Sequence, residues 1–238
     1  MKTYSEKILL IDSNSSSSQL IKKKLSLTGY TIILSNNGKD AFIKFQKEQP
    51  ALLILDLMLP DIDGYTFCTR IRKESVIPII IITSLDTITD RILSFNLGVD
   101  DFLKKPFYLS ELEVRTKAIL KRAKICKENS YEDEKDTLTI GKLKFNFRKK
   151  KVYSNNKFIK LTEIELNILE LLITKAGQTL SRDFILKNIW GYTPKRYGDD
   201  RIIDVHISRL RSKLEEKPNN PDLIITDWGN GYMFYKFQ

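Results

Sequence analysis

Two patterns of apolar and polar positions divide the chain. In the first, short apolar runs alternate with longer stretches whose apolar residues recur at helical spacing. We expect strands at residues 7–12, 31–35, 51–56, 78–82 and 100–103, and helices at 15–28, 39–49, 63–73, 87–97 and 108–123. Runs of consecutive apolar residues are typical of parallel strands that are buried on both faces. The pattern predicts an α/β fold with helices on both faces of a parallel sheet.

The second pattern begins near residue 138. Residues 138–160 alternate in short strands, residues 181–190 and 199–217 form helical patterns, and residues 223–237 form a hairpin pattern. Residues 161–175 form an amphipathic helix that starts at a capping box, Thr162 with Glu165, and stops near Gly177. Residues 124–137 carry charges of both signs without apolar periodicity, which indicates a linker. We therefore predict domains at residues 1–123 and 138–238, joined by a linker at 124–137.

Composition narrows the class of protein. The 238 residues are 42% hydrophobic and 29% charged, as in soluble globular proteins. No apolar run is long enough to cross a bilayer, and the first strand begins too early to leave room for a signal peptide. The two cysteines, Cys68 and Cys126, indicate neither a disulfide framework nor a metal site. We expect no membrane partner.

The net charge of +10 lies mostly in the second part of the chain. Residues 1–137 carry 21 Lys or Arg against 19 Asp or Glu, whereas residues 138–238 carry 19 against 11. A basic module joined to a nearly neutral one is typical of proteins that bind nucleic acid. A generic basic surface gives the same charge, so charge alone leaves both interpretations open.

Polar side chains end successive strands of the predicted sheet. Asp12 ends the first strand, Asp56 the third and Thr83 the fourth, and Lys105 follows the fifth. The carboxyl ends of parallel strands meet at one edge, where open α/β sheets bind their ligands. Two close carboxylates favour a hard cation such as Mg²⁺, and a lysine and a hydroxyl suit an aspartyl-phosphate. Singly each residue has an ordinary structural explanation, but together they predict a phosphoryl site.

These residues resemble a known family. Residues 7–123 resemble a receiver domain of two-component signalling, through Asp12, the block 55–64 around Asp56, Thr83 and the block 100–107. Residues 138–238 resemble the winged-helix DNA-binding domain of the OmpR/PhoB family, through residues 201–214 and 229–232. The resemblance implies a doubly wound five-stranded parallel sheet in the order 2-1-3-4-5. Within this family, the chain is similar to the RpaB-like type of cyanobacteria and plastid genomes. That similarity implies that the protein is located in a plastid stroma or otherwise in a bacterial cytoplasm.

The resemblance implies a role for each receiver residue. Asp56 would accept a phosphoryl group from a sensor histidine kinase, Thr83 and Lys105 would bind the phosphate, and Phe102 would be the aromatic switch. Mg²⁺ would be held by Asp12, by Asp56 and by the backbone carbonyl of Met58. Activation would pair two protomers as a homodimer through charged residues, namely Arg91, Asp100, Asp101, Glu111, Arg115 and Arg122.

The chain departs from the receiver pattern beside Asp12. Receivers usually have two adjacent acids there, and the second is replaced by Ser13, a neutral and weak ligand of Mg²⁺. Two outcomes are open. The site binds Mg²⁺ weakly and Asp56 is phosphorylated slowly, or the receiver is degenerate and the protein binds DNA without phosphate.

In the second domain, the resemblance implies a recognition helix in the major groove of promoter DNA. The resemblance places Ser208 and Arg209 near base edges, and Arg201, His206 and Arg211 near the backbone or the groove walls. Helical spacing puts Arg201, Val205, Ser208, Arg209 and Ser212 on neighbouring positions, where Val205 would contact a thymine methyl. His206, the single histidine in the sequence, is interpreted as a residue that is packed or contacts a phosphate. Tyr232 would donate to a phosphate, and residues 190–197 resemble the loop that contacts RNA polymerase. At the hairpin, Trp228 replaces the usual arginine of the wing, which predicts altered contact with the minor groove.

The sequence thus predicts a DNA-binding response regulator rather than an enzyme. One alternative is a Mg²⁺-dependent phosphohydrolase that uses Asp56 as its nucleophile. Such enzymes commonly carry a second acid two residues later, where this chain has Met58. The other alternative is a regulator that binds DNA independently of phosphate.

Overall fold

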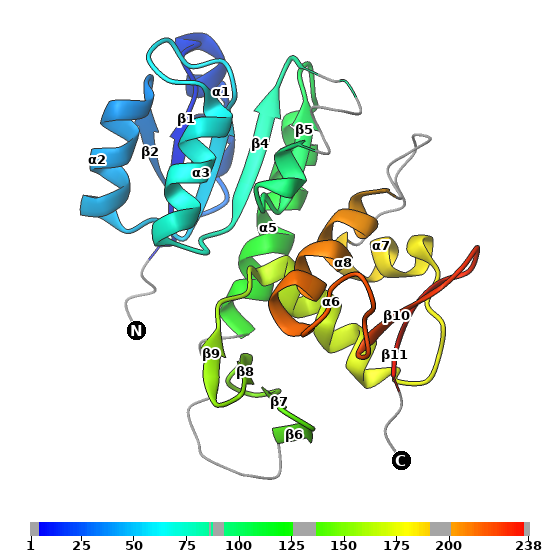
Figure 1. The fold of residues 1–238 in the computed structure, drawn as a ribbon. Helices are drawn as coiled ribbons and strands as arrows, with labels where there is room; N and C mark the ends of the chain where they lie inside the picture. The colour runs from blue at the N-terminus through cyan, green and yellow to red at the C-terminus, as the bar shows by residue number, and fades with distance from the viewer. Residues whose placement is uncertain (1–4, 86, 88–92, 126–136, 191–200, 236–238) are drawn as a thin grey trace. The chain divides into compact units, whose positions relative to one another are not determined.

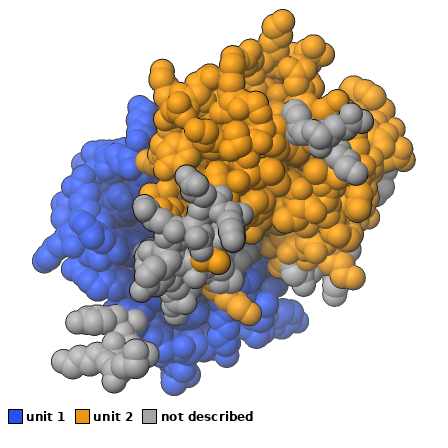
Figure 2. All heavy atoms as spheres, turned by 90° about the horizontal axis from the view of Figure 1, so that it is seen from below, with its two compact units in different colours: residues 1–120 blue, residues 121–238 orange. Residues whose placement is uncertain are grey.

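The computed structural model describes residues 5–85, 87, 93–125, 137–190 and 201–235, and only the backbone of residues 122–125. The chain divides into two compact units, Met1–Leu120 and Lys121–Gln238 (Figure 2). Each unit has a hydrophobic core of its own. No helix among the described residues is long and apolar enough to span a membrane.

The first unit contains a five-stranded parallel sheet in the order β2-β1-β3-β4-β5 (Figure 1). The strands are β1 Lys7–Ile11, β2 Thr31–Ser35, β3 Leu52–Asp56, β4 Ile79–Thr83 and β5 Asp101–Lys104. Every residue of β3 and β4 is buried, as their unbroken apolar runs predict. The predicted fold class and strand order are confirmed.

The helices of this unit are α1 Ser15–Ser26, α2 Gly38–Glu48, α3 Gly64–Glu74 and α5 Leu109–Ile125. Asn14, Asn37 and Asp63 each accept a backbone N–H of the helix that follows, which fixes where α1, α2 and α3 begin. Helices α1 and α5 bury apolar residues against one face of the sheet. In the region predicted as the helix 87–97, residues 93–96 are helical, whereas 88–92 lie outside the described residues.

The second unit is a winged helix. An antiparallel sheet comprises β6 Thr137–Ile140, β7 Leu143–Asn146, β8 Lys151–Ser154 and β9 Lys157–Ile159. Three helices follow, α6 Glu163–Thr174, α7 Arg182–Trp190 and α8 Arg201–Leu214. The wing is the hairpin of β10 Ile224–Asp227 and β11 Gly231–Phe234. The predicted winged helix is confirmed.

The predicted capping box of α6 is also confirmed. Thr162 Oγ1 accepts the backbone N–H of Glu165, and the Glu165 carboxylate accepts the N–H of Thr162 at 2.8 Å. Beyond the helix, Gly177 adopts a φ of +83° and donates its N–H to the carbonyl of Phe234. The end of α6 is thereby joined to the wing.

The domain limits drawn from the sequence stay predictions. Helix α5 continues to Ile125, which lies inside the predicted linker. Strand β6 begins at Thr137, which is the last residue of that linker. Residues 126–136 lie outside the described residues.

Candidate functional site

Four residues predicted from the strand ends converge at one edge of the parallel sheet. The ammonium of Lys105 lies 2.9 Å from Asp12 Oδ2 and 2.7 Å from Asp56 Oδ2. Asp12 and Asp56 are 2% and 7% exposed, and Thr83 is fully buried. A single cation therefore bridges two buried carboxylates, and it offsets part of the free energy required to bury them.

The local backbone fixes the geometry of these groups. Asp12 Oδ1 accepts the N–H of Asn14 at 2.9 Å, and Asp56 Oδ1 accepts the N–H of Met58 at 3.0 Å. The N–H of Lys105 donates to the carbonyl of Thr83 at 2.7 Å, so the residue after β5 is tied to the end of β4. Both carboxylates thus keep one oxygen on the backbone and direct the other toward Lys105.

Lys105 stays charged in this environment. Burial acts to lower the pKa of Lys105, but hydrogen bonds and charge pairing with Asp56 and Asp12 raise the pKa above its ordinary value. The side chain is an ammonium at neutral pH. The two carboxylates and this ammonium then have a net charge of −1, which favours a further cation more weakly than two unpaired carboxylates would.

Ser13 lies where the second acid of a receiver would lie. Its hydroxyl donates to the carbonyl of Met58 at 3.2 Å, the same carbonyl that the sequence predicts as a ligand. Asp12, Asp56 and this carbonyl are hard oxygen donors that suit Mg²⁺. Among the described residues, no group of three His, Cys, Asp or Glu is placed to hold a metal ion. A cation at this edge would depend on two carboxylates, a carbonyl and water.

The loop after Asp56 is fixed by close packing. Asp61 accepts the N–H groups of Gly38 and Lys39, at 2.7 and 2.9 Å, and so caps α2. A Cβ on Gly64 would lie 2.5 Å from Leu57 Cα, so the residue after Asp63 has no room for a side chain. These contacts leave the loop little freedom beside Asp56.

The structure corrects part of the predicted dimer surface. Asp100 is 1% exposed and accepts the backbone N–H of Ile79 and a hydrogen bond from Arg72. Asp101 is 3% exposed, and its two carboxylate oxygens accept from Arg115 Nη1 at 2.8 and 2.9 Å. Two charges expected at the surface are thus internal ion pairs. The sequence did not identify Arg72, because nothing local marks a partner 28 residues away.

Other predicted receiver residues have different positions. Arg115 also pairs with Glu111 at 2.7 Å, and the Glu111 side chain is 42% exposed. Phe102 is buried on β5, beside Ile81 of β4. Arg91 lies outside the described residues, as does the side chain of Arg122.

One face of α8 is exposed and carries few charges. Arg201, Ser208 and Ser212 are exposed and Val205 is partly exposed, at positions that fall on a single stripe of the helix. The opposite face, which includes Ile203, is buried in the core. A helix with a free stripe beside a hairpin is the arrangement that places a recognition helix in the major groove.

Glu165 holds one flank of α8. This buried carboxylate accepts from Arg209 Nε at 2.8 Å and from Lys213 Nζ. Burial acts to raise the pKa of Glu165, but Lys213, Arg209 and the N–H of Thr162 lower the pKa overall, so the group is an anion. Arg209, predicted near base edges, is therefore held toward α6. The sequence identified Glu165 only as a capping residue, because its contacts with α8 are tertiary.

The wing holds the other flank of α8. Arg211 donates to the carbonyl of Ile224 and to Thr226 Oγ1 at 2.8 Å, and Tyr232 Oη donates to Asp204 at 2.7 Å. Tyr232 is 5% exposed, and burial, followed by Asp204, raises its pKa to about 12. Arg211 and Tyr232 were predicted to contact DNA; both make hydrogen bonds within the domain, and their contact with DNA stays a prediction.

Of the two interpretations of His206, packed or in contact with a phosphate, the structure agrees with the packed one. It is fully buried, with its ring centroid 5.7 Å from that of Trp190. Burial lowers the pKa of His206 to about 3, so the imidazole is neutral. A buried neutral ring does not reach the DNA backbone, so the phosphate contact implied by the resemblance is not supported. Residues 191–197, predicted to contact RNA polymerase, lie outside the described residues.

We expect the second unit to lose stability in mild acid. The unfolded chain protonates His206 near pH 6.5, whereas the folded chain keeps it neutral down to about pH 3. The free energy of unfolding is therefore insensitive to this group above pH 6.5 and falls below it, by up to about 1.4 kcal/mol per pH unit. Urea unfolding between about pH 6.5 and 5 measures this, because Glu165, with its pKa lowered below 4.5, stays charged throughout.

Tryptophan fluorescence is the appropriate signal, since both tryptophans lie in the second unit. His206→Gln removes the titrating group, and its stability should be flat over the same interval. An equal decline in wild type and variant would contradict the assignment to His206.

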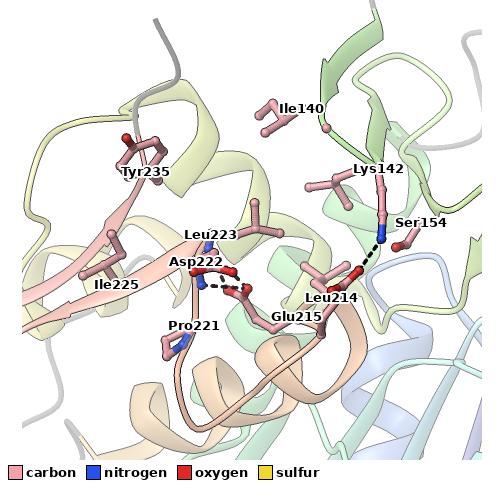
Figure 3. Close-up of a pocket in the computed structure, with 13 residues that line it drawn as sticks. Ile140, Lys142, Ser154, Leu214, Glu215, Pro221, Asp222, Leu223, Ile225 and Tyr235 are labelled. Carbon is pink, nitrogen blue, oxygen red and sulfur yellow. Dashed lines mark hydrogen bonds and ion pairs between the residues drawn. The ribbon is translucent and has the colours of Figure 1, made fainter.

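A pocket of about 520 Å³ lies between the β6–β7 turn, the end of α8 and the start of β10 (Figure 3). At its wall, Glu215 accepts the backbone N–H groups of Asp222, Leu223 and Ile224, the last at 2.9 Å. Figure 3 shows this carboxylate directed at the loop that leads into the wing. The contacts fix the base of the wing relative to α8.

Comparisons with known proteins agree with this architecture. Residues 8–117 match the family described as response regulator receiver domain, and residues 155–234 match transcriptional regulatory protein, C terminal. The chain is 45% identical over 236 residues to the probable transcriptional regulator ycf27 of Porphyra purpurea, covering 99% of this chain and 97% of that protein. It is 36% identical over 231 residues to the alkaline phosphatase synthesis transcriptional regulatory protein PhoP of Bacillus subtilis, covering 95% of each.

Among solved structures, the response regulator DrrB, a Thermotoga maritima OmpR/PhoB homologue, is similar with a TM-score of 0.51 and 29% identity. The match covers 98% of this chain and all of that one. The chain therefore belongs to the OmpR/PhoB family of two-component response regulators, and it is similar to the ycf27 (RpaB-like) regulators.

Proposed function

We propose that this response regulator is switched by phosphorylation of Asp56 by a sensor histidine kinase. One observation carries the proposal: Lys105 bridges Asp12 and Asp56 at the carboxyl edge of the sheet, with its ammonium 2.7 Å from the Asp56 carboxylate. A phosphoryl group on Asp56 would place its oxygens beside that ammonium and near Thr83.

The chemistry requires a carboxylate nucleophile. An oxygen of Asp56 attacks phosphorus, the P–N bond to the histidine of the kinase breaks, and the electron pair returns to the imidazole nitrogen. The Met58 N–H orients one Asp56 oxygen, and Lys105 balances charge on the other. Asp12, Asp56 and the Met58 carbonyl would hold Mg²⁺, which supplies positive charge to the phosphoryl oxygens when bound.

Activation would act through the β4–β5 edge. Thr83 ends β4, and Phe102 lies on the neighbouring strand β5, paired with Ile81 two residues before Thr83. A phosphate contact at Thr83 would reach the switch aromatic through these two strands. We propose that the shifted state pairs two protomers as a homodimer through Glu111, Arg115, Arg91 and Arg122. Asp100 and Asp101 are left out because their carboxylates are buried.

We propose that α8 reads promoter DNA with its exposed stripe. Val205 contacts a thymine methyl, Ser208 donates to a base edge, and Arg201 contacts the backbone or a guanine. Arg209 supports the helix through Glu165 and reaches DNA only if that pair opens. RNA polymerase is the proposed partner of residues 190–197. The relatives named ycf27 favour a plastid stroma as the compartment.

A second function has an observation in its favour. Ser13 removes one anion, and Lys105 already neutralises part of the charge of Asp12 and Asp56. Both features fit a receiver that adopts its working state without phosphate and binds DNA constitutively. A phosphohydrolase is disfavoured, because the position two residues after Asp56 is Met58, whose apolar side chain is 59% exposed.

Acetyl phosphate or BeF₃⁻ with Mg²⁺ distinguishes the two. We expect dimerisation by light scattering and at least about a tenfold gain in affinity for promoter DNA, which corresponds to about 1.4 kcal/mol. If the protein binds DNA in a salt-sensitive way but responds to neither reagent, the phosphate-independent regulator is the function that remains. An absence of salt-sensitive binding would contradict both.

A further inference from the structure

The tip of the wing presents an exposed indole. Trp228 lies in the turn between β10 and β11 and is 88% exposed, the highest fraction of any large hydrophobic residue described. The hairpin from Ile224 to Phe234 contains no lysine or arginine and one acid, Asp227. Whatever this wing contacts, the contact is made by an aromatic surface rather than by a cation.

The turn that carries Trp228 is braced. Asp227 accepts from Thr179 Oγ1 at 2.7 Å and from Asn230 Nδ2 at 3.0 Å, and the carbonyl of Asp227 accepts the Asn230 N–H. These side-chain hydrogen bonds lower the pKa of Asp227, and the carboxylate stabilises the turn. Gly231 is required, because a Cβ there would lie 2.0 Å from the carbonyl oxygen of Leu180. A fixed turn holds the indole outward with little loss of entropy on binding.

The base of the wing is fixed beside the exposed stripe of α8. Arg211 ties β10 to one flank of the helix, and the Tyr232–Asp204 hydrogen bond ties β11 to the same flank. When the stripe lies in a major groove, a hairpin attached to its flank crosses the sugar–phosphate backbone toward the adjacent minor groove. Apolar side chains that enter a minor groove stack on sugars or on a partly opened base step.

We propose that Trp228 enters the minor groove beside the major-groove site of α8 and stacks there as an uncharged aromatic wedge. The proposal rests on the proposed DNA binding by α8. The wing then contributes affinity by stacking, and its contribution is nearly independent of salt, because it neutralises no phosphate.

Fluorescence of the full-length protein tests this directly. Trp190 is 6% exposed, so Trp228 dominates the part of the emission that acrylamide quenches. The probe is a duplex isolated from a random pool by selection with wild-type protein. Saturation with this duplex should quench the emission of Trp228 and protect it from acrylamide. Trp228→Phe reports the Trp190 background and should show neither change.

Three variants measure the energetics. Trp228→Ala should weaken DNA binding at least about fivefold, which is the lower end of the range for the loss of one base–aromatic stack. Trp228→Phe should keep most of the wild-type affinity. Trp228→Arg should make the slope of log affinity against log salt more negative by about 0.9, because it adds one phosphate contact.

The outcomes separate the two proposals. A wild-type protein that binds no duplex overturns the proposed function and this inference together. A wild-type protein that binds the duplex while Trp228 stays as quenchable as in the free chain overturns the wedge alone. The wedge would also be overturned if wild type and Trp228→Ala bound DNA with equal affinity while only wild type bound RNA polymerase. That result would assign Trp228 to a protein partner.

Discussion

Asp56→Asn is expected to abolish phosphorylation by acetyl phosphate or by a phosphorylated kinase. The substitution keeps the shape of the side chain but replaces the anionic nucleophile with a neutral amide. Asp12 still pairs with Lys105, at 2.9 Å, so the edge of the sheet keeps a compensated charge and the fold should persist. Mass spectrometry of the intact protein measures the loss, and circular dichroism verifies the fold.

Asp63→Asn is the matched control. It makes the same chemical change in the same loop, at a residue whose side chain accepts the N–H of Thr66 at 3.0 Å to begin α3. Asparagine caps helices as well as aspartate, so the control should fold and take up phosphate normally. Phosphate on Asp56→Asn would place the acceptor elsewhere, and peptide mapping would locate it.

Ser13→Asp is expected to raise the affinity for Mg²⁺ at least tenfold, or about 1.4 kcal/mol, and to speed phosphorylation at limiting Mg²⁺. The hydroxyl of Ser13 already contacts the Met58 carbonyl, so a carboxylate there joins the proposed ligands. It changes the local charge from −1 to −2 beside the expected dication. Two unit charges about 4 Å apart near a surface interact by about 4 kcal/mol, and dehydration and solvent screening remove part of this.

Ser16→Asp is the control for this gain. It adds the same charge to an exposed residue of the first turn of α1, and its effect on Mg²⁺ affinity should be small. Calorimetric titration measures both variants in the absence of phosphate. Equal Mg²⁺ affinities for wild type and Ser13→Asp would place the metal elsewhere and favour the phosphate-independent regulator.

The receiver site was predictable because its residues are marked locally. Asp12, Asp56, Thr83 and Lys105 each follow an apolar run, and parallel strands place their carboxyl ends together regardless of the details of packing. The partners of those residues were not predictable. The pairing of Asp100 with Arg72, and of Asp101 with Arg115, depends on how β5 meets α3 and α5.

In the second unit, too, the partners of the predicted site residues could not be predicted, for the same reason. Helical spacing placed Val205 and Ser208 on one stripe, and the structure exposes that stripe. Spacing alone could not show that Glu165 holds Arg209, or that burial against Trp190 makes His206 neutral.

The sequence by itself determined the two domains, the parallel sheet with its group of strand-end residues, the capping box of α6 and the absence of the second acid at Ser13. These follow from apolar periodicity and from chain neighbours, which act over a few residues. Only the tertiary structure decided which charged side chains are available. It placed Lys105 between two carboxylates, held Arg209, Arg211 and Tyr232 inside the second unit, and left Trp228 exposed. Burial and ion pairing depend on segments distant in the chain, and no local pattern encodes which of them meet.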